Sequence, residues 1–240
     1  MTQVLKDPLN NTDMIYMTSE QRAKIFVTRR LPGQVEERMQ MLFDTRINES
    51  DNQLDADGLL ARIENASIVV SSIDDPLDKA LIKRLPEGVK LIAQFGNGVD
   101  NIDVEEAHRA GIIVTNTPSV LTEDTADMAM ALILSVPRRL VEGAQVVLGN
   151  EGWPGWSPTW MLGRRLFGKA LGIVGMGRIG TAVAHRARAF GLSIHYYSRQ
   201  RRPPQIEEPL AATYWPVLDE MLENVDIVSL HTPHTKETFN

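Results

Sequence analysis

Ten residues in the second half of the chain have the types and spacing of a phosphate-binding turn. Positions 171–180 read LGIVGMGRIG, so that an apolar strand runs into Gly175, Gly177 and Gly180. In a dinucleotide fingerprint the first glycine permits a tight turn, the second lets backbone approach a pyrophosphate, and the third lets helix and strand pack closely. The spacing therefore predicts that phosphates face the N-terminus of the following helix.

The elements expected around these glycines favour the nucleotide interpretation. An apolar strand precedes them, a helix from Arg178 to Phe190 follows, and Gly191 ends that helix before a second strand, Ser193 to Ser198. A glycine-rich turn without a ligand is the alternative.

The charge that follows the second strand indicates which dinucleotide binds. NAD-binding folds usually place an Asp or Glu there against the ribose 2′-hydroxyl, whereas this chain has Ser198, Arg199, Gln200, Arg201 and Arg202. Residues 152–206 contain nine Lys or Arg and no Asp or Glu. Because guanidinium groups donate charge-assisted hydrogen bonds to a phosphate, this loop favours NADP(H), with NAD(H) possible. A solvated basic loop is the alternative.

Composition narrows the class of protein. The 240 residues are 43% apolar and 23% charged, enough for two domains of about 100–150 residues. A net charge of −6 argues against general nucleic-acid or membrane binding. The absence of cysteine excludes disulfides, thiolate nucleophiles and Cys-zinc sites. His231 and His234 have no further ligand cluster, so we expect no metal site.

No segment predicts a membrane span or a secretory signal. The longest apolar run, Met128 to Val136, is too short to cross a bilayer, and residues 1–22 are too polar for a signal peptide. We expect a cytoplasmic protein in which residues 1–22 are a loose extension.

Short apolar runs alternate with helical patterns from Ala23 onward, which predicts an α/β fold with a mostly parallel sheet. The expected strands are Lys24–Thr28, Ile68–Ser71, Lys90–Phe95 and Ile112–Thr115. The expected helices are Gly33–Met41, Pro76–Leu85 and one capped by Asp103, with Glu106 completing a capping box and Gly111 ending the helix.

The domain boundary is expected between residues 118 and 119, before a long helix that begins near Thr122. Pro137 should interrupt this helix, which resumes from Arg138 to Leu148. After the two nucleotide strands come a helix, Leu218–Asn224, and a strand, Asp226–His231.

Three tryptophans lie between the long helix and the nucleotide strand. Trp153, Trp156 and Trp160 alternate with Pro154 and Pro158, which keep the segment irregular. Large aromatics anchor interfaces, so the segment packs either on its own domain or against a second subunit.

A second glycine turn, GNGVD at 96–100, follows the strand Lys90–Phe95. Such a turn can aim consecutive backbone N–H groups at one point and form a nest for an anion such as a substrate carboxylate. A plain tight turn is the alternative.

Taken together, residues 94–139 and 163–238 resemble the D-isomer-specific 2-hydroxyacid dehydrogenases, especially the glyoxylate and hydroxypyruvate reductases. The matching segments are FGNGVDNID at 95–103, GIIVTNTP at 111–118, LTEDTAD at 121–127, LGIVGMGRIG at 171–180, and HTPHT at 231–235 with Thr238. Residues 23–89 agree in layout but carry no diagnostic motif.

The resemblance implies a flavodoxin-like substrate domain over residues 23–118 and a Rossmann domain over residues 119–240. Between them a small 2-oxo acid would be reduced by NAD(P)H. It implies that the Asn97 and Gly98 N–H groups bind the substrate carboxylate. The implied cofactor contacts are Met176, Gly177, Arg178 and Ile179 at the pyrophosphate, Ser198, Arg199 and Gln200 at the 2′-phosphate, and His231, Thr232, Pro233 and Thr238 beside the cofactor.

One part of the family pattern is missing. The substrate-binding Arg and the Glu-paired catalytic His would lie beyond Asn240, and none of the five histidines matches the catalytic one. We therefore expect no catalytic residue within this chain, doubtful activity for it alone, and a nucleotide sheet that stops at four strands, with Asp226–His231 unpaired on one side.

The resemblance also implies a homodimer through residues 122–165. Two alternatives to a glyoxylate or hydroxypyruvate reductase stay open. One is a nucleotide-sensing interaction module without catalysis, as in the family's corepressor branch. The other is a dehydrogenase for a different acid, such as phosphoglycerate or formate.

Overall fold

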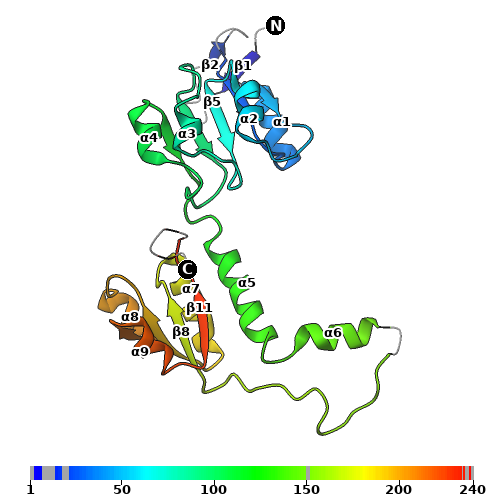
Figure 1. Cartoon of the computed structure of the whole chain (residues 1–240). Coiled ribbons are helices and arrows are strands. Elements are labelled where there is room, and N and C mark those ends of the chain that lie inside the picture. Colours follow the sequence, from blue (N-terminus) through cyan, green and yellow to red (C-terminus); the bar gives the residue numbers. More distant parts are fainter. Residues whose placement is uncertain are drawn as a thin grey trace. The chain divides into compact units, whose positions relative to one another are not determined.

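The alternating apolar runs form two separate parallel sheets, each with helices of its own (Figure 1). The computed structural model describes residues 3–6, 14–17, 22–149, 152–233, 235 and 238. It divides into one unit of residues 1–118 and a second of residues 119–240. The sequence pattern places its boundary at the same position.

The first unit contains five parallel strands in the order β4-β3-β5-β6-β7. Numbered within this sheet the order is 2-1-3-4-5, which is that of flavodoxin-like folds, so the expected fold is confirmed. The strands are β3 (Lys24–Val27), β4 (Asp44–Ile47), β5 (Ile68–Ser71), β6 (Leu91–Gln94) and β7 (Ile113–Thr115). The helices are α1 (Gly33–Leu42), α2 (Ala56–Ile63), α3 (Lys79–Ile82) and α4 (Val104–Arg109).

Apolar side chains from the internal strands and from α2, α3 and α4 form the core of this unit. Ile92 on β6 and Leu59 on α2 are fully buried in it. Helix α4 begins as expected, because the Asp103 carboxylate accepts a hydrogen bond of 2.9 Å from the Glu106 N–H. It ends before Gly111, whose φ of +72° favours glycine.

The second unit contains four parallel strands in the order β10-β9-β8-β11. Numbered within the unit this is 3-2-1-4, the first part of the Rossmann order 3-2-1-4-5-6. The strands are β8 (Ala170–Val174), β9 (Ser193–Tyr197), β10 (Thr213–Trp215) and β11 (Ile227–Leu230). The helices are α5 (Thr122–Ser135), α6 (Leu140–Leu148), α7 (Arg178–Ala189), α8 (Pro204–Leu210) and α9 (Leu218–Leu222).

Strand β11 lies at the edge of this sheet. Among the described strands its only partner is β8, with Leu230 opposite Val174. Within the described residues the sheet thus has four strands, and β11 pairs on one side. An unpaired edge exposes backbone N–H and C=O groups that another strand can pair with.

The long helix is interrupted as Pro137 predicts. Helix α5 ends at Ser135 and α6 begins at Leu140, after Arg139 adopts a left-handed φ of +53°. In the described range 152–169 no helix or strand forms. Within that range Trp153 and Trp160 pack edge to face, with ring centroids 5.0 Å apart.

Several elements differ from the sequence expectations. Strands β4 and β10 and helices α2 and α8 are additional. Of these, β4 is a short, largely polar strand, which lacks the apolar pattern of a buried strand. Helix α8 contains Pro209, and proline usually breaks a helix. The helix expected over Pro76–Leu85 shortens to α3, because Leu77 forms a bridge to Ile102 and Asp78 caps the helix. The segment expected to be loose, residues 1–22, contains two antiparallel strands, β1 (Gln3–Lys6) and β2 (Met14–Met17).

The buried position of Ile92 generates a stability prediction. Truncation to alanine leaves a cavity in a core without solvent, so Ile92→Ala should cost about 2–5 kcal/mol of unfolding free energy. Ile113→Ala, on the adjacent strand β7 at an exposed position, should cost less than about 1 kcal/mol. Urea unfolding of both variants measures the difference, and equal losses would contradict the core assignment.

Candidate functional site

The glycine turn lies directly after β8, where the chain reverses into helix α7. Gly175 has a φ of +96°, and a Cβ at this position would lie 2.6 Å from the carbonyl oxygen of His231. A side chain is excluded by both the conformation and the space. The turn therefore requires glycine at its first position.

The other two glycines differ in what surrounds them. A Cβ on Gly180 would overlap the Gly175 carbonyl oxygen and approach Ile173 Cγ2 to 3.1 Å, so the helix packs too closely for a side chain. Gly177 is the N-cap of α7, and a Cβ added to it would have no described atom within 4 Å. This open space in front of the helix N-terminus is what a bound pyrophosphate needs.

The first N–H groups of α7 face this space without a side-chain cap among the described residues. Such groups have no intrahelical acceptor and carry the positive end of the helix dipole. The Met176 N–H is different, because it donates a 2.8 Å hydrogen bond to Ser198 Oγ. That bond joins the glycine turn to the end of β9, so the two predicted nucleotide-binding segments lie together.

Two of the predicted basic-loop residues, Arg199 and Gln200, are exposed and form no hydrogen bond or ion pair with any described residue. Arg201 instead pairs with the buried carboxylate of Glu207, with Nη2 2.9 Å and Nε 3.0 Å from its oxygens. Glu207 is the first acidic residue after residues 152–206, the range without Asp or Glu from which an unpaired basic loop was predicted. Arg199 is therefore an exposed cation without a described partner, whereas Arg201, although exposed, is already paired.

The Glu207 carboxylate also accepts a hydrogen bond from the hydroxyl of Tyr196, a fully buried residue of β9. The hydrogen bonds from Arg201 and Tyr196 lower the pKa of Glu207. Burial, with the hydrogen bond to Glu207, raises the pKa of Tyr196 to about 12. Glu207 is therefore ionised and Tyr196 neutral at pH 7.

The predicted residues after β11 lie beside the glycine turn. The His231 N–H donates to the Val174 carbonyl at 2.8 Å, and its Nε2 lies 2.9 Å from Ser229 Oγ. Burial lowers the pKa of His231, so the imidazole is neutral at pH 7. Thr232 Cγ2 lies 3.1 Å from the position of a Cβ on Gly175.

The loop that follows is held by Thr238. Its hydroxyl donates to the Pro233 carbonyl at 2.7 Å and accepts from the Thr235 N–H at 2.8 Å. His234, one member of the pair considered as metal ligands, lies outside the described residues.

The second predicted turn, in the first unit, follows β6. The N–H groups of Asn97 and Gly98 donate to no other residue in the described part of the chain, as a nest for an anion requires. Their carbonyls are held from behind by amides: Asn116 Nδ2 donates to Asn97 O at 2.7 Å, and Gln94 Nε2 to Gly98 O at 3.4 Å. Gly96 is required for space, because its Cβ would lie 2.8 Å from Ile73 Cγ2.

A buried polar network supports this turn. Asn101 Nδ2 donates to the carbonyls of Ser72 and Asp75, each at 3.0 Å, while its Oδ1 accepts from Gln94 Nε2 at 2.9 Å. Asp75 Oδ2 accepts from Thr28 Oγ1 at 2.5 Å. Burial raises the pKa of Asp75. The network ties the ends of three neighbouring strands together, which sequence patterns did not reveal.

Three buried side-chain atoms of this region have no hydrogen-bond partner among the described residues. They are Ser72 Oγ, Asp75 Oδ1 and Asn97 Oδ1. Buried polar atoms in folded proteins are normally paired, so unpaired ones indicate a ligand or water. They gather in the loops at the carboxyl ends of β5 and β6, where the nest lies.

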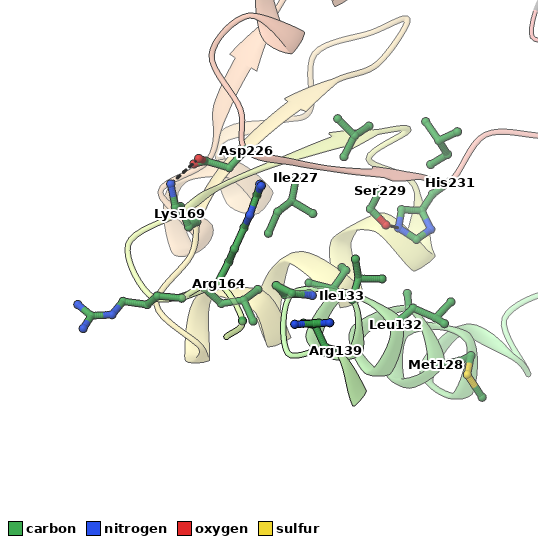
Figure 2. Close-up of a pocket in the computed structure, with 18 of the residues that line it drawn as sticks. Met128, Leu132, Ile133, Arg139, Arg164, Lys169, Asp226, Ile227, Ser229 and His231 are labelled. Atoms are coloured by element: carbon green, nitrogen blue, oxygen red, sulfur yellow. Dashed lines mark hydrogen bonds and ion pairs between the residues drawn. The ribbon is translucent and has the colours of Figure 1, made fainter. Parts of the chain in front are cut away.

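An apolar groove of about 820 Å³ lies between α5 and the open side of β11 (Figure 2). Met128, Leu132 and Ile133 line it from α5, and Arg164 extends into it from the segment before β8. The Lys169–Asp226 ion pair, at 2.7 Å, lies at one end. Of the predicted cofactor residues only His231 lines this groove, so it is distinct from the glycine turn.

The described residues form neither a metal site nor a membrane span. Across the described ranges, no three metal-ligating side chains come together. No helix there is both long and apolar enough to traverse a bilayer.

The chain is similar to known proteins in sequence and in fold. Residues 130–240 match the family model described as D-isomer specific 2-hydroxyacid dehydrogenase, NAD binding domain. The glyoxylate reductase of Thermococcus litoralis is 42% identical over 223 residues, which cover 91% of this chain and 66% of that protein. The chain thus spans slightly less than two thirds of the length of this relative.

Two solved structures share the fold. One, from Polaromonas sp. JS6 66, is assigned to the D-isomer specific 2-hydroxyacid dehydrogenases and has a TM-score of 0.82 and 38% identity, covering 90% of this chain and 67% of that one. The other is an NADPH-dependent glyoxylate/hydroxypyruvate reductase from Sinorhizobium meliloti in complex with NADP and malonate. It has a TM-score of 0.72 and 36% identity, and the match covers 90% of this chain and 64% of that one.

The contrast between two glycines generates the second prediction. Gly180→Ala should destabilise the second unit by about 1–3 kcal/mol, because α7 must move away from the turn. Gly177→Ala should cost no more than about 1 kcal/mol, from the poorer N-cap preference of alanine, because its Cβ meets open space. Thermal and urea unfolding measure both, and a larger loss for Gly177→Ala would refute this account of the turn.

Proposed function

The chain belongs to the D-isomer-specific 2-hydroxyacid dehydrogenase family, and we propose that it carries the substrate nest and the first half of the nucleotide site of an NADP(H)-dependent reductase. The substrate is a small 2-oxo acid of the glyoxylate or hydroxypyruvate type, and the product is the D-2-hydroxy acid. The observation that carries the proposal is the glycine turn after β8, with open space before α7 and an exposed arginine at the end of the next strand.

In this proposal the pyrophosphate lies against the N–H groups at Gly177, Arg178 and Ile179. The helix dipole and the unpaired N–H groups favour its negative charge without any side-chain cation. Ser198 and Arg199 hold the adenosine ribose and its 2′-phosphate. The nicotinamide supplies the hydride, and the protein residues orient it.

His231, Thr232 and Pro233 border the cofactor from the end of β11. Ligands of open α/β sheets bind outside the carboxyl ends of the strands, where the strand order reverses. In this sheet the reversal falls between β8 and β11, the two strands that the Gly175–His231 approach joins.

The carboxylate of the 2-oxo acid is bound by the N–H groups of Asn97 and Gly98. Gln94, Asn101 and Asn116 hold the turn from behind, so the two N–H groups are preorganised. Preorganised donors cost no rearrangement when the anion binds. The support from glyoxylate reductases at about 40% identity favours a short acid over a large one.

A second copy of the chain is the proposed partner of α6 and the tryptophan arm, residues 152–165. Leu148 and Trp156 are more than 80% exposed, and Val147 and Leu162 are also exposed. Apolar side chains of this size are costly to leave in water, and aromatic residues of this kind anchor interfaces. The arm of each copy would therefore cover that of the other.

Cofactor preference gives the third prediction. Arg199→Asp removes the exposed guanidinium and places a carboxylate near the 2′-phosphate. We expect NADPH affinity to fall about 10- to 100-fold and NADH affinity to change little. Arg38→Asp, the same charge change at an exposed site on α1, is the control. Isothermal titration calorimetry measures the affinities of the wild type and both variants for NADPH and for NADH. Unchanged NADPH binding in Arg199→Asp would defeat the assignment.

The proposed interface gives the fourth prediction. Purified chain should sediment as a dimer at micromolar concentration, and Trp156→Ala with Leu148→Ala should shift it toward monomer, because the burial of both side chains stabilises the contact. Phe190→Ala, an exposed aromatic at the C-cap of α7, is the control. Sedimentation velocity distinguishes the two states, and a wild-type monomer at all concentrations would rule out this interface.

A further inference from the structure

The loop over residues 198–202 is attached to the second unit at four points. Ser198 Oγ accepts from the Met176 N–H, and the Ser198 carbonyl accepts from Tyr214 Oη at 3.4 Å. The Arg202 N–H donates to Tyr196 Oη at 2.8 Å. The fourth attachment is the pair between Arg201 and Glu207. The side chains of Arg199, Gln200 and Arg202 have no partner among the described residues; those of Arg199 and Gln200 are exposed, whereas Arg202 Nε is buried.

Glu207 connects two of these attachments. Its carboxylate is buried and accepts from Arg201 and from the Tyr196 hydroxyl, which itself accepts from the Arg202 N–H. A buried carboxylate is tolerated only when it is paired and hydrogen-bonded, and here both conditions are met. The carboxylate therefore fixes the Arg201 side chain and, through Tyr196, the backbone next to it.

Arg201 keeps a free donor while it is held. Its Nε and Nη2 bind Glu207, the guanidinium lies over the Tyr214 ring at 5.8 Å, and Nη1 donates to no residue in the described chain. The side chain is 66% exposed on its outer side. A guanidinium has five N–H donors in a planar fork, so one edge can bind a carboxylate while the other binds a phosphate.

We propose that Glu207 is a positioning residue for recognition of the 2′-phosphate: it orients Arg201 so that the free edge of the guanidinium, together with Arg199, binds that phosphate. This inference rests on the proposed NADP(H) site. It assigns the choice between NADPH and NADH partly to a buried acid on α8 that does not touch the cofactor. The ordering of a flexible arginine before binding lowers the entropy lost when the phosphate arrives.

The experiment compares coenzyme affinities of the whole chain with those of substituted chains by calorimetry. Glu207→Leu removes both hydrogen bonds and should weaken NADPH binding about tenfold, with NADH binding unchanged within about twofold. Glu207→Gln keeps acceptor oxygen for Arg201 or Tyr196 and should retain most of the NADPH affinity. Glu208→Leu, at the exposed neighbouring position, is the matched control and should change neither affinity.

Three results would overturn the inference. One is an unchanged NADPH affinity in Glu207→Leu. Another is an equal loss for both coenzymes, which a merely structural role would produce. The third is tighter NADPH binding, which would mean that the ion pair withholds Arg201 from the phosphate. If Glu207→Leu does not fold, the test depends on Glu207→Gln. This variant is expected to retain most of the NADPH affinity, so loss of all NADPH preference in it would contradict the inference.

Amide hydrogen exchange separates this inference from the proposed function. If the wild-type chain binds neither coenzyme, the NADP(H) proposal fails on its own. The Arg202 amide, bonded to Tyr196 Oη, should still exchange at least about tenfold faster in Glu207→Leu than in wild type if Glu207 positions the loop. An unchanged exchange rate would show that Glu207 does not position it.

Discussion

The close approach of helix α7 to the turn after β8 is the constraint on which the second unit depends. No side chain fits at Gly175 or Gly180, because the carbonyls of His231 and Gly175 already occupy those positions. This contact points the N-terminus of α7 toward the carboxyl ends of β8 and β11. The open space at Gly177 follows from it, and so does the position of His231 and Ser198 around the turn.

The two units use the same design at the ends of their parallel strands. In each, a glycine turn after an internal strand presents backbone N–H groups, and nearby side chains hold the turn from behind. Gln94 and Asn101 do so in the first unit, and Ser198 does so in the second. Backbone donors bind anions without adding a mobile charge, so both turns suit ligands with carboxylate or phosphate groups.

Local patterns with a direct physical cause were predictable from the sequence. The Asp103 cap, the break at Pro137 and the glycine fingerprint each depend on residues within a few positions. The family and both fold types were also predictable, because the motifs occur in order along the chain.

Tertiary pairings were not predictable in the same way. Glu207 lies just past the acid-free range and pairs with Arg201 only after α8 folds back on β9, so the loop appeared more basic than it is. Helix α8 was missed because Pro204 and Pro209 read as breakers, although a proline in the first turn is compatible with a helix. The network around Asp75 joins residues 28, 72 and 101, which no local pattern connects.

The central claim is that backbone N–H groups at the start of α7 bind the pyrophosphate of a nicotinamide dinucleotide. The most direct measurement is a ¹⁵N–¹H correlation spectrum of the labelled chain during titration with NADPH. The account predicts that the largest shifts fall on Gly177, Arg178 and Ile179, followed by Ser198 and Arg199. Saturable binding with no shift at residues 177–179, or no binding at all, would contradict it.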